Sequence, residues 1–150
     1  TRRDALSLPP FLFLGDPAAL SARAGPGIGA VVTFSGLCRD EGGTLAALEI
    51  EHYPGMAEEE IFRVAQEAWI RWPLKGLTAV HRHGRIAPGE PIVLVVAASS
   101  HRADAFAAAE FLMDYLKTSA PFWKKEHRID GSAGDWVAAK DSDETAAGRW

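Results

Sequence analysis

Apolar residues recur along the chain at two different spacings, which predict an alternation of strands and helices. Between Met56 and Trp72 they recur every three or four positions, and Glu58, Glu59 and Glu60 lie in the first turn, where negative charge suits a helix N-terminus. A second segment with helical spacing runs from about Arg102 to Thr118. Because prolines at positions 73 and 121 cannot continue a helix, both segments should end before them. The sequence therefore predicts two main helices.

Strands are predicted around and between these helices, because the remaining apolar segments are short and rich in β-branched residues. They cover residues 30–37, 45–52, 77–85, 91–98 and 122–129, with a further short strand within the first 16 residues. The turn residues at 40–43 predict that the first two of these strands form a hairpin. Residues 91–98 are apolar enough for the centre of a sheet. The order β, β, α, β, β, α, β predicts an α+β fold with two helices on a mostly antiparallel sheet.

Composition limits the class of protein. The 150 residues, 47% of them hydrophobic and without an internal repeat or linker, predict a single domain over residues 1–150. One cysteine, Cys38, excludes an internal disulfide and favours the reducing cytoplasm. The net charge of −4 argues against a nucleic-acid partner, and no apolar run is long enough to predict a membrane span. A site for an anion must therefore be a local cluster of cations.

The junction between the strand at 91–98 and the second helix is a candidate anion site. Ser99, Ser100, His101 and Arg102 lead into the helix, whose first backbone N–H groups have no partner within the helix. His101 adds a titratable donor and Arg102 a guanidinium that suits phosphate. The alternative is that Ser100 caps the helix while His101 and Arg102 are ordinary surface residues.

Two lysines and one arginine are further candidates. Lys117 lies in the last turn of the second helix, and Lys124 begins the strand that follows, which could direct it back towards the helix end. Two neighbouring lysines suit acid–base chemistry, although both could equally be surface residues. Arg39 ends the first strand and could be an ordinary ion-pair partner, while Cys38 is better explained as a small buried residue than as a nucleophile.

Histidines raise the question of a metal site. His81 and His83 share one face of a strand, and together with His101 they leave a metal-dependent hydrolase as an alternative. No carboxylate or thiolate partners can be identified for them, so we expect no metal. A binding module without catalytic activity is the other alternative.

Six segments together resemble the catalytic, large subunits of molybdopterin synthase. They are GAVVTFSG (29–36) followed by Arg39, LEIEHYPGM (48–56), VHRHGRI (80–86), SSHR (99–102), FLMDYLK (111–117) and APFWKKE (120–126). The resemblance extends from about Phe11 to Trp150, and the combination of segments is specific although each alone is not.

This resemblance implies an α/β-hammerhead type of fold and a homodimer of large subunits within a heterotetramer. A small ubiquitin-like sulfur-carrier subunit would bind at each end and insert its C-terminal glycine, a thiocarboxylate, into the pocket. The substrate would be cyclic pyranopterin monophosphate (precursor Z), the product molybdopterin, and no cofactor or metal would be needed.

The resemblance also implies the residues of the pocket. Lys117 would contact the terminal carbonyl of the carrier, and Lys124 would assist in acid–base chemistry. The substrate would be bound by Phe34, Arg39, His101, Arg102, Lys125 and Lys140. Two features depart from the family: the turn at 40–44 is short, and Lys140 stands where relatives can have an arginine that reaches the neighbouring subunit, so the bidentate contact of a guanidinium would be lost.

Overall fold

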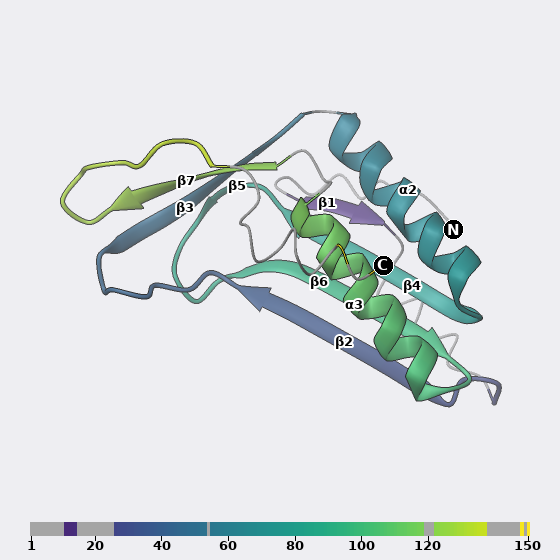
Figure 1. The fold of residues 1–150 in the computed structure, drawn as a ribbon. Helices are drawn as coiled ribbons and strands as arrows, with labels where there is room; N and C mark the ends of the chain where they lie inside the picture. Colours follow the sequence, from purple (N-terminus) through teal and green to yellow (C-terminus); the bar gives the residue numbers. More distant parts are fainter. Residues whose placement is uncertain (1–10, 15–25, 54, 119–121, 138–147, 149) are drawn as a thin grey trace.

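The structure is a computed structural model that describes residues 11–14, 26–53, 55–118, 122–137, 148 and 150. Its elements are β1 (Phe11–Leu14), β2 (Ala30–Leu37), β3 (Leu45–His52), α2 (Met56–Arg71), β4 (Leu74–Arg82), β5 (Gly84–Ile86), β6 (Pro91–Ser99), α3 (Arg102–Thr118) and β7 (Phe122–Arg128) (Figure 1). Both predicted helices are present within one residue of their expected ends, which confirms the α+β class.

The strands form two sheets in which every described pair is antiparallel. The four-stranded sheet has the order β1-β4-β6-β2, and the three-stranded sheet has the order β5-β3-β7. The apolar strand β6 lies inside the four-stranded sheet, between β4 and β2, as its composition predicted. An antiparallel arrangement is thus confirmed, but it is divided between two sheets.

The predicted hairpin of residues 30–37 and 45–52 is wrong. β2 pairs with β6, whereas β3 pairs with β5 and β7 in the other sheet. The connection cannot form a tight turn because Cys38 is held by the β5–β6 loop: its N–H donates to the Glu90 carbonyl and its carbonyl accepts from Gly89. The Asp40 carboxylate then accepts from the N–H groups of Gly42 and Leu45, which starts β3 in a new direction.

The single strand expected at residues 77–85 is two strands in different sheets. β4 ends at Arg82 in the four-stranded sheet, and β5 begins at Gly84 in the three-stranded sheet. Gly84 has a φ of 87°, a backbone conformation that residues with a Cβ rarely adopt. This glycine therefore lets the chain pass from one sheet to the other beside His81 and His83.

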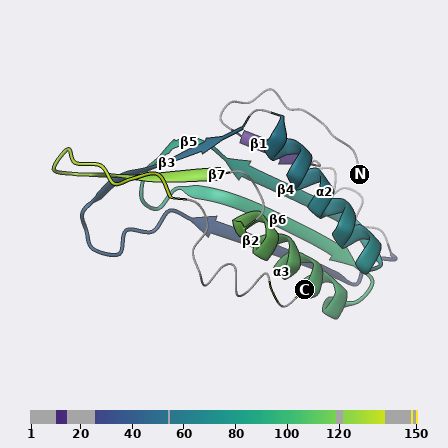
Figure 2. The ribbon, with the colours of Figure 1, turned by 45° about the horizontal axis from the view of Figure 1, so that its top comes forward.

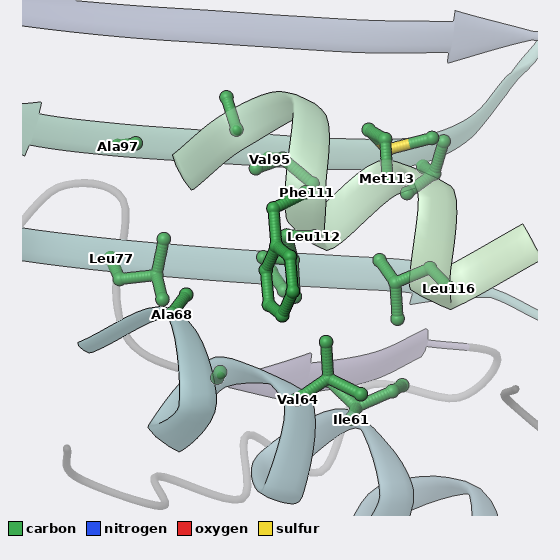
Figure 3. Close-up of a cluster of buried hydrophobic side chains, with 14 of the residues drawn as sticks. Ile61, Val64, Ala68, Leu77, Val95, Ala97, Phe111, Leu112, Met113 and Leu116 are labelled. Atoms are coloured by element: carbon green, nitrogen blue, oxygen red, sulfur yellow. The ribbon is translucent and has the colours of Figure 1, made fainter. Parts of the chain in front are cut away.

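Helices α2 and α3 lie against the same side of the four-stranded sheet (Figures 1 and 2). Their apolar faces meet alternate residues of β4 and β6 in one core, in which Phe111 and Leu112 of α3 and Val64 of α2 are almost fully buried (Figure 3). α3 runs back from the end of β6 towards the three-stranded sheet, so its last turn lies near the junction of the two sheets (Figures 1 and 2). Within the described part of the chain, no helix has the length and apolarity of a membrane span.

Candidate functional site

A buried histidine lies where the two sheets meet. His81, near the end of β4, is 7% exposed, and its ring stacks on that of Phe122 with centroids 3.9 Å apart and planes 13° from parallel. Its Nδ1 lies 2.8 Å from the carbonyl oxygen of Arg82. Because a carbonyl can only accept, this contact assigns the ring proton to Nδ1 and leaves Nε2 without a proton.

This histidine stays uncharged near neutral pH. Burial is the main cause that lowers the pKa of His81 from 6.5 to about 4, because a charged ring loses solvation there. The positive charges of Lys124 and Lys117 lower the pKa further, and so does His83, whereas the hydrogen bond to the Arg82 carbonyl opposes them.

The charges of two lysines from different elements therefore act on the same ring. Lys117 is exposed in the last turn of α3, and Lys124 is half-buried on β7, two residues after Phe122. The backbone of Lys124 exchanges two hydrogen bonds of 2.8 Å with Val137, which fixes the strand at this position. Since the charges of both lysines act on His81, α3 and β7 bring two cations to one region of the surface.

Lys125 points elsewhere, because neighbouring residues of a strand face opposite sides. Its Nζ lies 5.4 Å from the ring centroid of Trp136. Trp136 also lines an open pocket of about 360 Å³ together with Glu51, His52, Tyr53 and Trp123. The structure therefore separates Lys125 from the pair formed by Lys117 and Lys124.

Phe34 and Arg39 belong to the edge strand β2 and the segment after it. The Phe34 ring is 41% exposed and lies over Gly36, where a Cβ would be 3.4 Å from the ring and 2.6 Å from Val93. Arg39 is exposed and pairs with Glu41. The ion-pair alternative considered for Arg39 is thus present, in a geometry open to solvent that leaves the guanidinium accessible to a ligand.

His101 and Arg102 lie at the other end of α3. Both are exposed, and the His101 N–H donates to the Ser99 hydroxyl at 3.5 Å. The Ser100 hydroxyl donates to the Gly27 carbonyl at 2.9 Å, which ties the start of the helix to the segment before β2. Fifteen residues separate Arg102 from Lys117 along one helix, which corresponds to about 22 Å. One chain therefore does not bring these two groups of cations together.

The metal alternative finds no support in this arrangement. His81 pairs with Val93, whereas His101 follows Ser99 at the opposite end of β6, about 20 Å along the strand. His83 is close to His52, with ring centroids 4.2 Å apart. Across the segments that the structure describes, no three His, Cys, Asp or Glu side chains form a group suited to a metal ion. Lys140, the remaining predicted site residue, lies outside the described residues.

Sequence reasoning missed the contribution of Phe122 and treated His81 only as a possible metal ligand. The sequence did hold one signal for the role of His81: it follows apolar residues in a predicted strand, where a charged group would be costly to bury and an uncharged ring is therefore expected. The stacking partner could not be identified, because 41 residues separate the two rings in the sequence.

Comparison with known proteins gives the family. The family model described as "MoaE protein" matches residues 15–119. A molybdopterin synthase catalytic subunit from Mesorhizobium japonicum is 72% identical over 123 residues, which cover 82% of this chain and 77% of that protein. The solved structure of the molybdopterin biosynthesis MoaE protein from Burkholderia ambifaria has a TM-score of 0.74 and 52% identity, covering 89% of this chain and 86% of that one.

A more distant solved structure shares the fold. It comes from Helicobacter pylori and is described as a protein–protein complex of subunits 1 and 2 of molybdopterin-converting factor, with a TM-score of 0.63 and 21% identity over 83% of this chain and 80% of that one. The resemblance found in the sequence segments is confirmed by these matches. The chain therefore belongs to the MoaE family of molybdopterin synthase catalytic subunits, enzymes of molybdenum cofactor biosynthesis.

Proposed function

We propose that the chain inserts sulfur into cyclic pyranopterin monophosphate to form molybdopterin. The sulfur donor is the thiocarboxylated C-terminal glycine of a small ubiquitin-like carrier subunit, and two transfers complete the dithiolene. The description of its relatives as catalytic subunits, and the Helicobacter pylori complex of two subunits, support such a partner. The single cysteine, Cys38, is buried and suits work in the reducing cytoplasm.

The observation that carries this proposal is that the positive charges of Lys117 on α3 and Lys124 on β7 both act on one buried ring, that of His81. In each transfer the thiocarboxylate sulfur bonds to the pterin, and water then attacks the carrier's carbonyl, so that the acyl–sulfur bond breaks through an oxyanion and the carrier leaves as a carboxylate. The thiocarboxylate and the substrate phosphate are also anions. Fixed positive charge stabilises each of them most strongly where water is partly excluded. Lys117, the more exposed of the two, contacts the carrier's terminal carbonyl, and the half-buried Lys124 assists in proton transfer.

A second copy of the chain completes the pocket. His101 and Arg102 lie about 22 Å along α3 from Lys117, too far for one substrate to touch both ends. In a homodimer, the His101–Arg102 end of one chain binds the phosphate beside the lysines of the other. Arg39 follows Cys38, whose backbone is hydrogen-bonded to Gly89 and Glu90 just before β6 begins. This end of β6 is the one away from the start of α3, so Arg39 lies at the same end of the molecule as the two lysines.

Three further residues have supporting roles in this proposal. The exposed ring of Phe34 offers a flat surface on which the pterin stacks. Lys125, beside Trp136, contributes positive charge at the rim on the other side of β7. Lys140, which lies outside the described residues, contributes to substrate binding as a single point charge, without the fork of an arginine.

Reconstitution tests the reaction. The purified chain is mixed with thiocarboxylated carrier and cyclic pyranopterin monophosphate, and molybdopterin is detected by mass spectrometry. We expect product with the thiocarboxylate and none with the ordinary carboxylate form of the carrier. Stable binding of the carrier without product would instead favour a binding module that lacks catalytic activity.

Mixing two inactive variants tests the shared pocket. Lys117→Ala and Arg102→Ala chains are combined and allowed to exchange subunits. If each pocket takes groups from two chains, half of the dimers contain one intact pocket, so about a quarter of wild-type activity should return. Absence of recovery in mixtures that are shown to contain heterodimers would contradict a shared pocket.

A further inference from the structure

The contact between His81 and Phe122 joins the two sheets, and Phe122 lies between the two lysines along the chain. His81 belongs to β4 in the four-stranded sheet, and Phe122 begins β7 in the three-stranded sheet. Phe122 is itself 7% exposed and part of the main core. Along the chain, Phe122 lies between Lys117 at the end of α3 and Lys124 on β7. A change in this contact would therefore shift one lysine relative to the other.

The His81 ring is held on two sides. Its face lies nearly parallel to the Phe122 ring at 3.9 Å, and its Nδ1–H points to the Arg82 carbonyl at 2.8 Å. These contacts fix both the position and the tautomer of the imidazole. The titratable groups that act on it are Lys124 of β7, Lys117 of α3 and His83 beyond its own strand, and each of them disfavours a charge on the ring.

We propose that His81 is a positioning residue for sulfur transfer, whose uncharged ring, held between Phe122 and the Arg82 carbonyl, sets the separation of Lys117 and Lys124. The inference rests on the roles proposed above for these two lysines. An uncharged ring does not repel the two ammonium groups whose charges act on it, whereas a charged ring would repel them and a missing ring would remove the contact with Phe122. Because catalysis depends on the placement of reacting groups to within about 1 Å, a small shift is enough to slow the reaction.

The first test measures proximity and needs no activity. The pKa of His81 is followed by NMR of its ring nitrogens in the full chain, in Lys117→Met and in Lys124→Met, with the exposed Lys75→Met on β4 as a matched control. Both site variants should raise the pKa of His81, because each removes a positive charge that lowers it, and the control should not. The wild-type ring should show the neutral Nδ1–H tautomer at pH 7. An unchanged pKa in either site variant would overturn the proposal.

The second test measures sulfur transfer. His81→Ala should lower kcat about tenfold or more, with a smaller change in KM for the pterin, because the lysines are misplaced and not removed. His81→Phe, which keeps an uncharged ring for stacking, should restore kcat to within about threefold of the wild type. Leu77→Ala, at a buried position on the same strand, should lose stability but keep its kcat at a temperature where it is folded.

The outcomes separate this inference from the proposed function. A wild-type kcat in His81→Ala, or a His81→Phe variant as slow as His81→Ala, would overturn the positioning role even if the lysines are essential. Normal sulfur transfer in Lys117→Ala and Lys124→Ala would instead remove the proposed function of the lysines. Should His81→Ala fail to fold, the NMR measurement and a Phe122→Leu variant, which should also lower kcat, still decide the question.

Discussion

Replacing His81 by phenylalanine should make the protein less sensitive to acid. Burial lowers the pKa of His81 from its ordinary 6.5 to about 4 in the folded protein. At a pH between about 4 and 6.5, this histidine therefore binds a proton in the unfolded chain but not in the folded chain. The stability associated with the neutral ring is fully present above pH 6.5 and is lost as the pH falls towards 4. For this one group the loss amounts to about 1 kcal/mol at pH 5.5 and about 2–3 kcal/mol at pH 4.5.

Urea unfolding of wild type and His81→Phe at pH 7.5, 5.5 and 4.5 measures this difference. At pH 7.5 the variant lacks one hydrogen bond to the Arg82 carbonyl and should be less stable by about 1 kcal/mol. By pH 4.5 the order should reverse, because only the wild type loses stability by protonation of residue 81 in its unfolded state. Other acid-sensitive groups, including His83, are common to both proteins and cancel in the comparison.

A matched control removes effects of substitution alone. Thr78→Val changes another buried residue of β4 without adding or removing a titrating group, so its free energy of unfolding should follow the pH dependence of the wild type. If the difference between His81→Phe and wild type stays constant from pH 7.5 to 4.5, His81 is not a buried neutral histidine, and the electrostatic account of the lysine pair would have to be abandoned.

Two further substitutions test packing near the site and in the core. A Cβ at Gly29 would collide with the Ser100 carbonyl oxygen, so Gly29→Ala should lower the free energy of unfolding in urea by about 1–3 kcal/mol. It should also raise KM for the pterin severalfold, because the segment before α3 would move. Gly27→Ala, where the added Cβ lies in open space, should change neither quantity, and equal effects of the two substitutions would contradict the reasoning. Phe111→Ala should cost about 3–5 kcal/mol because the ring is fully buried, while Phe106→Ala, 60% exposed on the same helix, should cost well under 1 kcal/mol; similar losses would show that burial is not the cause.

Local patterns were sufficient to predict most elements but not their partners. The helices at 56–71 and 102–118 follow directly from three-and-four spacing and from the prolines beyond them, and β6 follows from its uninterrupted apolar residues. The hairpin failed because a turn at residues 40–43 indicates only that the chain changes direction, and the strand that pairs with β2 comes more than fifty residues later. Strand pairing over such distances leaves no local signal.

The candidate site, too, could be predicted from the sequence only in part. The position of Lys124 just after the helix that ends with Lys117 indicated that the two lysines could be neighbours, and in the structure the charges of both act on His81. The family resemblance placed these lysines in one pocket with His101 and Arg102, but within one chain the structure does not bring the two groups together. This separation depends on the length and direction of α3, which put the two groups at opposite ends of the helix.

Steady-state sulfur transfer by Lys117→Ala and Lys124→Ala tests the central claim most directly. The assay uses thiocarboxylated carrier and cyclic pyranopterin monophosphate, and Lys75→Ala, an exposed lysine of β4, is the control. We expect kcat to fall about a hundredfold or more in both site variants, because the oxyanion loses a fixed charge, and to stay at the wild-type value in the control. Near-normal kcat in both site variants would contradict the claim that this lysine pair carries the reaction.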